Sequence, residues 1–127
     1  MIAAGDIGLF RILVVDDEPD LRYLLRRTFE RAGHEVVDAG NGAAALACVR
    51  QSPPDLVVTD MMMPVMGGAE LIRRLRANPA TAQIPIIAET SDPQLAVGAD
   101  AVMFKPYHHA ELVATAHALL TQKAERT

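Results

Sequence analysis

Short apolar runs alternate along the chain with longer segments in which apolar and polar residues are mixed. The first run, "RILVV" at residues 11–15, contains β-branched side chains and is followed by acidic residues, which predicts a buried strand. Four later runs are of the same kind: "EVVDA" at 35–39, "DLVVTD" at 55–60, "IPIIAET" at 84–90 and "AVMFK" at 101–105. The pattern therefore predicts five strands.

The segments between these strands carry apolar residues at helical spacing. After the first strand, Leu21, Leu25 and Phe29 recur every four positions, and Gly33 is the expected end of that helix. Three further helices are predicted on the same grounds: residues 43–50, 68–77 and 109–122. Apolar strands separated by helices predict a parallel sheet covered on both faces, which is a doubly wound α/β fold.

The length and composition fit one soluble domain. The chain has 127 residues, of which 50% are hydrophobic and 22% charged. We expect residues 11–122 to form the domain, residues 1–10 to be a loose extension and residues 123–127 a tail.

Charge and cysteine content narrow the possible functions. The net charge of −4 argues against direct nucleic-acid binding, and the single cysteine, Cys48, excludes an internal disulfide. No apolar stretch reaches the roughly 18 residues of a membrane span. The first ten residues also lack the pattern of a secretion signal. We therefore expect a cytoplasmic protein without membrane contact.

Polar residues follow the predicted strands at their carboxyl ends, where open parallel sheets bind ligands. These are Asp16, Asp17, Asp60, Thr90 and Lys105. Clustered carboxylates form an oxygen-only site that suits Mg²⁺. A carboxylate beside such an ion can attack a phosphoryl group, while an ammonium and a hydroxyl stabilise the developing charge. The strand ends therefore predict phosphoryl transfer to a carboxylate.

Four segments, in order, carry a resemblance to a known family: "ILVVDDEPDLRYLLRRTFERAGHEV", "DLVVTDMMMPVMGG", "IPIIAETS" and "GADAVMFKP". The chain resembles the CheY-like receiver domains of bacterial two-component response regulators. That resemblance implies a five-stranded (βα)5, flavodoxin-like fold. It also implies an aspartyl phosphate formed with Mg²⁺ from the phosphohistidine of a sensor histidine kinase or a phosphotransfer protein.

The resemblance also assigns roles to individual residues. Asp60 matches the phosphoacceptor, and Asp16 and Asp17 match the acidic pair that holds Mg²⁺ together with Asp60. The other matches are Met62, whose backbone carbonyl is a metal ligand in the family, Thr90, whose hydroxyl moves onto the phosphoryl group, and Lys105, whose ammonium pairs with it. The Lys105–Pro106 peptide bond is usually cis in the family.

Three features depart from the family pattern. Thr90 and Lys105 are separated by only 105 − 90 = 15 positions, so the helix that usually follows the fourth strand is expected to be truncated or absent. Val102 stands where many receivers carry Tyr or Phe. Glu89 occupies a strand position that is normally apolar, and we expect it to reach solvent beside the short segment or to pair with a cation.

Each site residue also has a structural interpretation. Asp16 and Asp17 can cap a helix, Asp60 can shape a loop, Thr90 is common in strands and Lys105 can be a surface lysine. Ser91 can share the role of Thr90. His108, His109 and His117 are expected to be surface or helix-end residues. The combined pattern favours the receiver interpretation.

Two other classes of function are alternatives. A haloacid-dehalogenase-like phosphohydrolase also uses an aspartyl nucleophile with Mg²⁺, but it requires D-x-D after the first strand, and here Asp16 and Asp17 are adjacent. A receiver-like interaction module that works without phosphate is favoured by Val102 and the short segment. It is disfavoured by the intact site residues.

The receiver interpretation also sets the expected activity and partners. We expect a signalling protein that catalyses only its own phosphorylation and dephosphorylation. It would act through contacts with a downstream protein, as a monomer or weak dimer.

Overall fold

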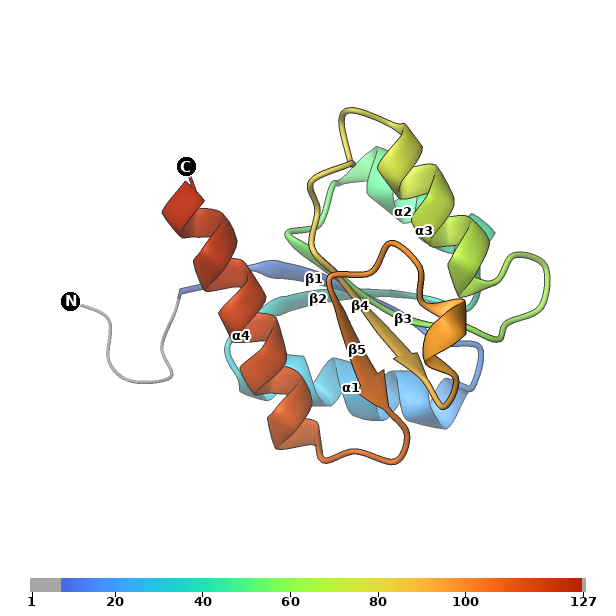
Figure 1. The fold of residues 1–127 in the computed structure, drawn as a ribbon. Coiled ribbons are helices and arrows are strands. Elements are labelled where there is room, and N and C mark those ends of the chain that lie inside the picture. Colours follow the sequence, from blue (N-terminus) through green and yellow to red (C-terminus); the bar gives the residue numbers. More distant parts are fainter. Residues whose placement is uncertain (1–7, 127) are drawn as a thin grey trace.

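A computed structural model describes residues 8–126, which contain one five-stranded sheet (Figure 1). All neighbouring strands are parallel, in the order β2-β1-β3-β4-β5. The strands are β1 (Arg11–Val15), β2 (Glu35–Ala39), β3 (Leu56–Asp60), β4 (Ile86–Thr90) and β5 (Ala101–Phe104). The predicted parallel sheet is confirmed, with β4 beginning two residues later than expected.

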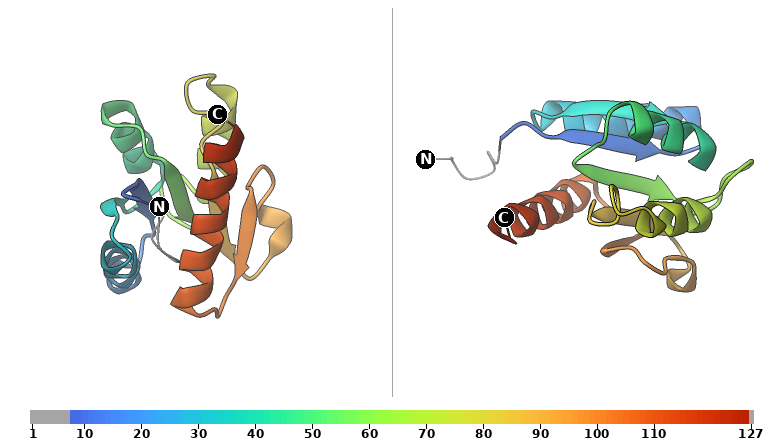
Figure 2. Two further views of the ribbon diagram at one scale, coloured as in Figure 1. Left: turned by 90° about the vertical axis from the view of Figure 1, so that its left-hand side faces the viewer. Right: turned by 90° about the horizontal axis from the view of Figure 1, so that it is seen from above.

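Helices cover both faces of this sheet, as a doubly wound fold requires (Figure 2). They are α1 (Pro19–Arg31), α2 (Gly42–Gln51), α3 (Gly68–Ala77) and α4 (His109–Arg126). Helices α1 and α4 lie on one face, and α2 and α3 lie on the other. The first helix ends as predicted, since Gly33 adopts a φ of 95° just beyond it. Among residues 8–126, no helix is long and apolar enough to cross a membrane.

Alternate side chains of each strand supply two separate hydrophobic cores. Leu13, Val57 and Ile86 pack against α2 and α3, whereas Ile12, Val58 and Ile87 pack against α1 and α4. All six side chains are fully buried. Because each central strand is anchored on both faces, its carboxyl end is held rigidly in place.

The two ends of the domain differ from their predicted boundaries. Phe10 packs against the α1–α4 core, and its backbone N–H donates to Nδ1 of His34 at 3.2 Å. Helix α4 runs through Arg126, so residues 123–126 continue the helix. The predicted loose extension falls mostly on residues 1–7, which lie outside the described residues.

The connection between β4 and β5 contains a single turn of 3-10 helix, η1 (Pro93–Leu95). This confirms the truncation that the short sequence predicted. The Arg76 side chain of α3 holds the shortened segment against the residues that precede β4. Its guanidinium donates to the Gly98 carbonyl and the Asp100 carboxylate in the segment, and to the carbonyls of Ala82 and Ile84 before β4. A side chain thus holds the loop where many receivers have a longer helix.

Candidate functional site

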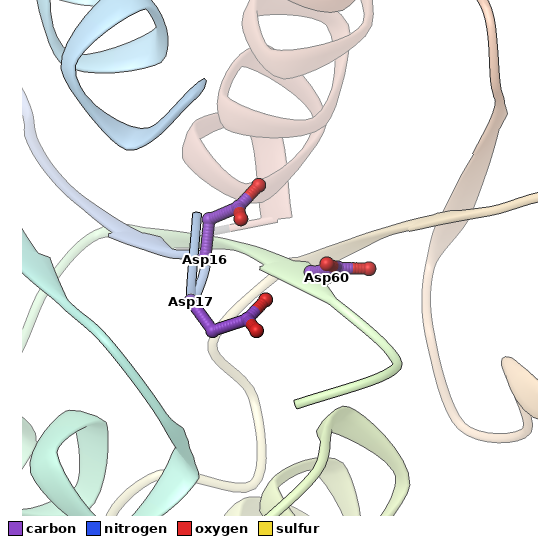
Figure 3. A group of neighbouring side chains, drawn as sticks. All are labelled: Asp16, Asp17 and Asp60. Carbon is purple, nitrogen blue, oxygen red and sulfur yellow. The ribbon is translucent and has the colours of Figure 1, made fainter. Parts of the chain in front are cut away.

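Three aspartates meet at the carboxyl ends of the two central strands. Asp16 and Asp17 follow β1, Asp60 ends β3, and one carboxylate oxygen from each lies within 4.8 Å of the others (Figure 3). Because β1 and β3 are adjacent in the sheet, residues distant in sequence arrive at one point. The structure therefore brings together the acidic residues that the strand ends predicted.

Asp60 is held in place by a contact of its side chain and a close approach to its backbone. It is 8% exposed, and its Oδ1 accepts a hydrogen bond from the Met61 backbone N–H at 2.7 Å. Behind it, α3 begins so close that a Cβ on Gly68 would lie 2.4 Å from the Asp60 carbonyl oxygen. Only glycine permits this close approach between helix and strand, so the loop after Asp60 is fixed from both ends.

Lys105 completes the cluster from the end of β5. Its Nζ donates to Asp60 Oδ1 at 3.1 Å, and the following Lys105–Pro106 peptide bond is cis, as the family resemblance implied. Burial lowers the pKa of the Lys105 ammonium, but the hydrogen bond and charge of Asp60 outweigh that effect and raise it overall. Lys105 is therefore a fixed positive charge beside Asp60.

The cluster carries an excess of negative charge. Asp16 is 1% exposed, and burial together with the charges of Asp60 and Asp17 raises its pKa, against the opposing hydrogen bond from the Glu18 N–H. Asp17 is exposed to solvent. Hard carboxylate oxygens, close together and open to water on one side, fit Mg²⁺ better than softer metals. Asp16, Asp17 and Asp60 are the residues that would hold it.

The capping interpretation of the acidic pair is wrong for α1. Glu18 is the N-cap residue, and its side chain accepts from the Asp20 backbone N–H. Asp16 instead accepts from the Glu18 N–H, and its backbone carbonyl accepts from the Arg22 guanidinium at 2.8 Å. Arg22 thereby connects α1 to the site, a contact that the sequence did not predict.

Thr90 ends β4, and Met62 lies two residues beyond the end of β3. Thr90 is buried at the end of β4, where its hydroxyl donates to the Asp92 carbonyl and accepts from the Asp92 N–H. The Met62 side chain is 72% exposed on the loop that follows Asp60. Their roles toward phosphate and metal remain predictions.

The expectation for Glu89 is wrong. The side chain is 2% exposed and lies on the α1–α4 face, since it shares strand parity with Ile87. Its Oε2 accepts from the Tyr107 hydroxyl, so its partner is neither solvent nor a cation. Burial raises the pKa of Glu89 to about 7, opposed by that hydrogen bond and reinforced by Asp16. Strand alternation alone predicts which face of the sheet the Glu89 side chain occupies, but it does not predict that Tyr107 contacts that side chain.

Comparison with known proteins agrees with this geometry. The response regulator receiver domain family matches residues 12–117. The phosphate regulon transcriptional regulatory protein PhoB of Pseudomonas aeruginosa is 40% identical over 116 residues, which are 86% of this chain and 51% of PhoB. Protein PilH of the same organism is 36% identical over 117 residues, covering 87% of this chain and 97% of PilH.

Solved structures show the same fold. The response regulator TrrA of Thermotoga maritima, crystallised in complex with Mg²⁺ and BeF, has a TM-score of 0.78 and 32% identity, covering 86% of this chain and 97% of TrrA. This chain spans about half the length of PhoB and of some other curated relatives. The family model matches most of the chain, and the parallel sheet and the three clustered aspartates are consistent with that match. The chain therefore belongs to the response regulator receiver domain family.

Proposed function

We propose that Asp60 accepts a phosphoryl group from the phosphohistidine of a sensor histidine kinase or a phosphotransfer protein. One observation carries the proposal: the buried Asp60 carboxylate lies 3.1 Å from the Lys105 ammonium and beside the carboxylates of Asp16 and Asp17. A nucleophile, a fixed cation and a set of metal ligands thus share one edge of the sheet.

The chain's own residues can be assigned to each part of the transfer. A carboxylate oxygen of Asp60 forms a bond to phosphorus while the phosphorus–nitrogen bond of the donor breaks. The electron pair stays on the donor imidazole, which takes a proton. Lys105 pairs with the incoming phosphoryl oxygens, and the Thr90 hydroxyl can turn from Asp92 to donate to them. Bound Mg²⁺ would offset the charge of the carboxylates and the phosphoryl oxygens.

The product is an acyl phosphate on the chain itself. The domain is therefore proposed to act as a switch that catalyses only its own phosphorylation and dephosphorylation. Its signal would pass through contacts with a downstream protein, as a monomer or weak dimer. The transcriptional regulation and the sensor histidine kinase activity named for its longer relatives belong to those proteins.

Phosphorylation by acetyl phosphate tests the proposal. Wild-type protein should gain one phosphoryl group by intact-mass spectrometry with Mg²⁺ and much less after chelation, while Asp60→Asn gains none. Asp55→Asn is the matched control, because Asp55 accepts from the Arg11 N–H at the opposite end of the same strand. Uptake that persists on another residue in Asp60→Asn would contradict the assignment.

Two other results would favour the alternative functions. Folded wild-type protein that takes up no phosphate would favour a phosphate-independent interaction module. Multiple turnover of p-nitrophenyl phosphate would favour a phosphohydrolase.

A further inference from the structure

The Arg22 side chain reaches from α1 back to the loop between β1 and α1, which carries the acidic pair. Its Nη1 donates to the Asp16 backbone carbonyl at 2.8 Å. The Asp16 N–H donates in turn to the Ala39 carbonyl at 3.1 Å, at the end of the neighbouring strand β2. The Asp16 backbone is therefore held on two sides, by α1 and by β2.

Gly40, just after β2, leaves room for the Arg22 guanidinium. A Cβ on Gly40 would lie 3.3 Å from Arg22 Nη1, which is closer than ordinary van der Waals contact. Among residues 8–126, the guanidinium has no carboxylate oxygen within 4.0 Å. The polar contact of Arg22 is therefore with the Asp16 backbone and not with an acidic side chain.

Asp17 depends on this backbone for its position. Its side chain is exposed and makes no hydrogen bond within residues 8–126, so no neighbour orients it directly. The peptide group that joins Asp16 to Asp17 is planar, so a donor on the Asp16 carbonyl also fixes the Asp17 nitrogen and Cα. Loss of that donor would let the Asp17 carboxylate move away from those of Asp16 and Asp60.

We propose that Arg22 is a positioning residue for the metal site, and that it holds Asp17 where Mg²⁺ requires it. This role rests on the proposed function, in which Asp16, Asp17 and Asp60 hold the ion. Groups that orient metal ligands from behind commonly set metal affinity. The charge of Arg22 acts in the opposite direction, because a cation near the site repels Mg²⁺. Positioning and charge therefore predict opposite changes in affinity when Arg22 is replaced by a neutral residue.

Direct titration with MgCl₂, followed by ¹⁵N–¹H correlation spectra, tests the proposal. Arg22→Gln should bind Mg²⁺ roughly tenfold more weakly than wild type. Arg22→Lys, which keeps a charged donor, should recover most of that loss. Arg27→Gln is the matched control, because Arg27 is exposed on the same helix and bonds to Tyr23, away from the Asp16 carbonyl. This control removes the same charge and should bind Mg²⁺ as tightly as wild type.

The rate of phosphorylation by acetyl phosphate separates positioning from a general loss of structure. In Arg22→Gln, the Mg²⁺ concentration that gives half the maximal rate should rise. The maximal rate at saturating Mg²⁺ should stay within about twofold of wild type, because the groups that react are unchanged. If Arg22→Gln fails to fold, Gly40→Ala carries the test, since its Cβ displaces the guanidinium and should also weaken Mg²⁺ binding.

Several results would overturn the role of Arg22. These are Arg22→Gln binding Mg²⁺ as tightly as wild type or more tightly, an equal loss of affinity in Arg27→Gln, and wild-type protein that binds no Mg²⁺. If Arg22→Gln does not fold, unchanged affinity in Gly40→Ala has the same meaning. Wild-type protein that binds Mg²⁺ but takes up no phosphate would contradict the phosphoacceptor role of Asp60 alone, and the titration would still decide the role of Arg22.

Discussion

The Nη2 atom of Arg76 lies 2.6 Å from Oδ2 of Asp100, which joins the end of α3 to the residue before β5. The same Asp100 oxygen accepts from the Ile86 backbone N–H, so one carboxylate connects α3, the start of β4 and the short loop. Arg76 also satisfies the carbonyls of Ala82, Ile84 and Gly98. Where the family usually has a longer helix, a partly exposed polar network centred on the half-buried Arg76 holds the chain.

Arg76→Gln should therefore destabilise the domain by about 1 kcal/mol, because the carbonyl of the buried Ile84 and the partly or fully exposed acceptors of Ala82, Gly98 and Asp100 lose their donor. Urea unfolding followed by circular dichroism measures the loss. Arg73→Gln is the control: Arg73 is exposed and bonds to Glu70 of the same helix, so its loss should change stability little. Equal effects of the two changes would show that the network contributes nothing.

Removing Asp17, a proposed metal ligand, should separate metal binding from folding. Asp17→Ala should abolish the rise in melting temperature that Mg²⁺ gives to wild-type protein and should slow phosphorylation. Without Mg²⁺ the variant should melt at the same or a higher temperature, because Asp17 adds to the repulsion at Asp16. Asp20→Ala, in the first turn of α1, is the control. A variant that unfolds while keeping its Mg²⁺ affinity would make Asp17 a structural residue.

The His34–His117 pair should make the domain sensitive to acid. The Phe10 N–H donates to His34 Nδ1, so His34 Nε2 carries the hydrogen that faces His117 Nε2 at 2.9 Å. Neither neutral ring can gain a proton without losing a hydrogen bond. Burial, and for His34 the neighbouring His117, lowers both pKa values below 6.5, although Asp55 partly opposes this for His34.

The direction of the pH effect follows from these lowered pKa values. The unfolded chain binds more protons than the folded one, so the stabilisation is complete above about pH 6.5 and is lost as pH falls through the folded pKa values. Urea unfolding between about pH 8 and 5 should show this decline, and His117→Gln should flatten it. An unchanged slope in the variant would assign the decline to other groups.

Phosphorylation should act chiefly on the segment between Thr90 and Gly98. Leu95 and Val97 are exposed, and only Ala96 is buried between Ser91 and Gly98, so few contacts resist a change there. Hydrogen exchange with the phosphate mimic beryllofluoride should alter protection in this segment. The prediction is wrong if protection changes chiefly at residues 111–120, or if the mimic produces a tight dimer through this face.

Most of the fold and the acidic rim could be predicted from the sequence, because both depend on local pattern. An apolar run such as "LVV" before Asp60 forms a buried strand wherever it pairs, and parallel strands bring their carboxyl ends to one edge. The length between Thr90 and Lys105 likewise limited what could form there, and a single turn was found.

The tertiary structure alone decided which distant side chains became partners. Tyr107, just after β5, covers Glu89 of the neighbouring β4 across 18 positions. His34, just after α1, meets His117 of α4 across 83 positions, because α1 and α4 pack on the same face of the sheet. A hydrogen bond requires donor and acceptor within about 3 Å, whereas hydrophobic periodicity states only which face a side chain occupies. The sequence by itself therefore determined the strands, the helices and the rim residues, and packing determined the hydrogen bonds between them.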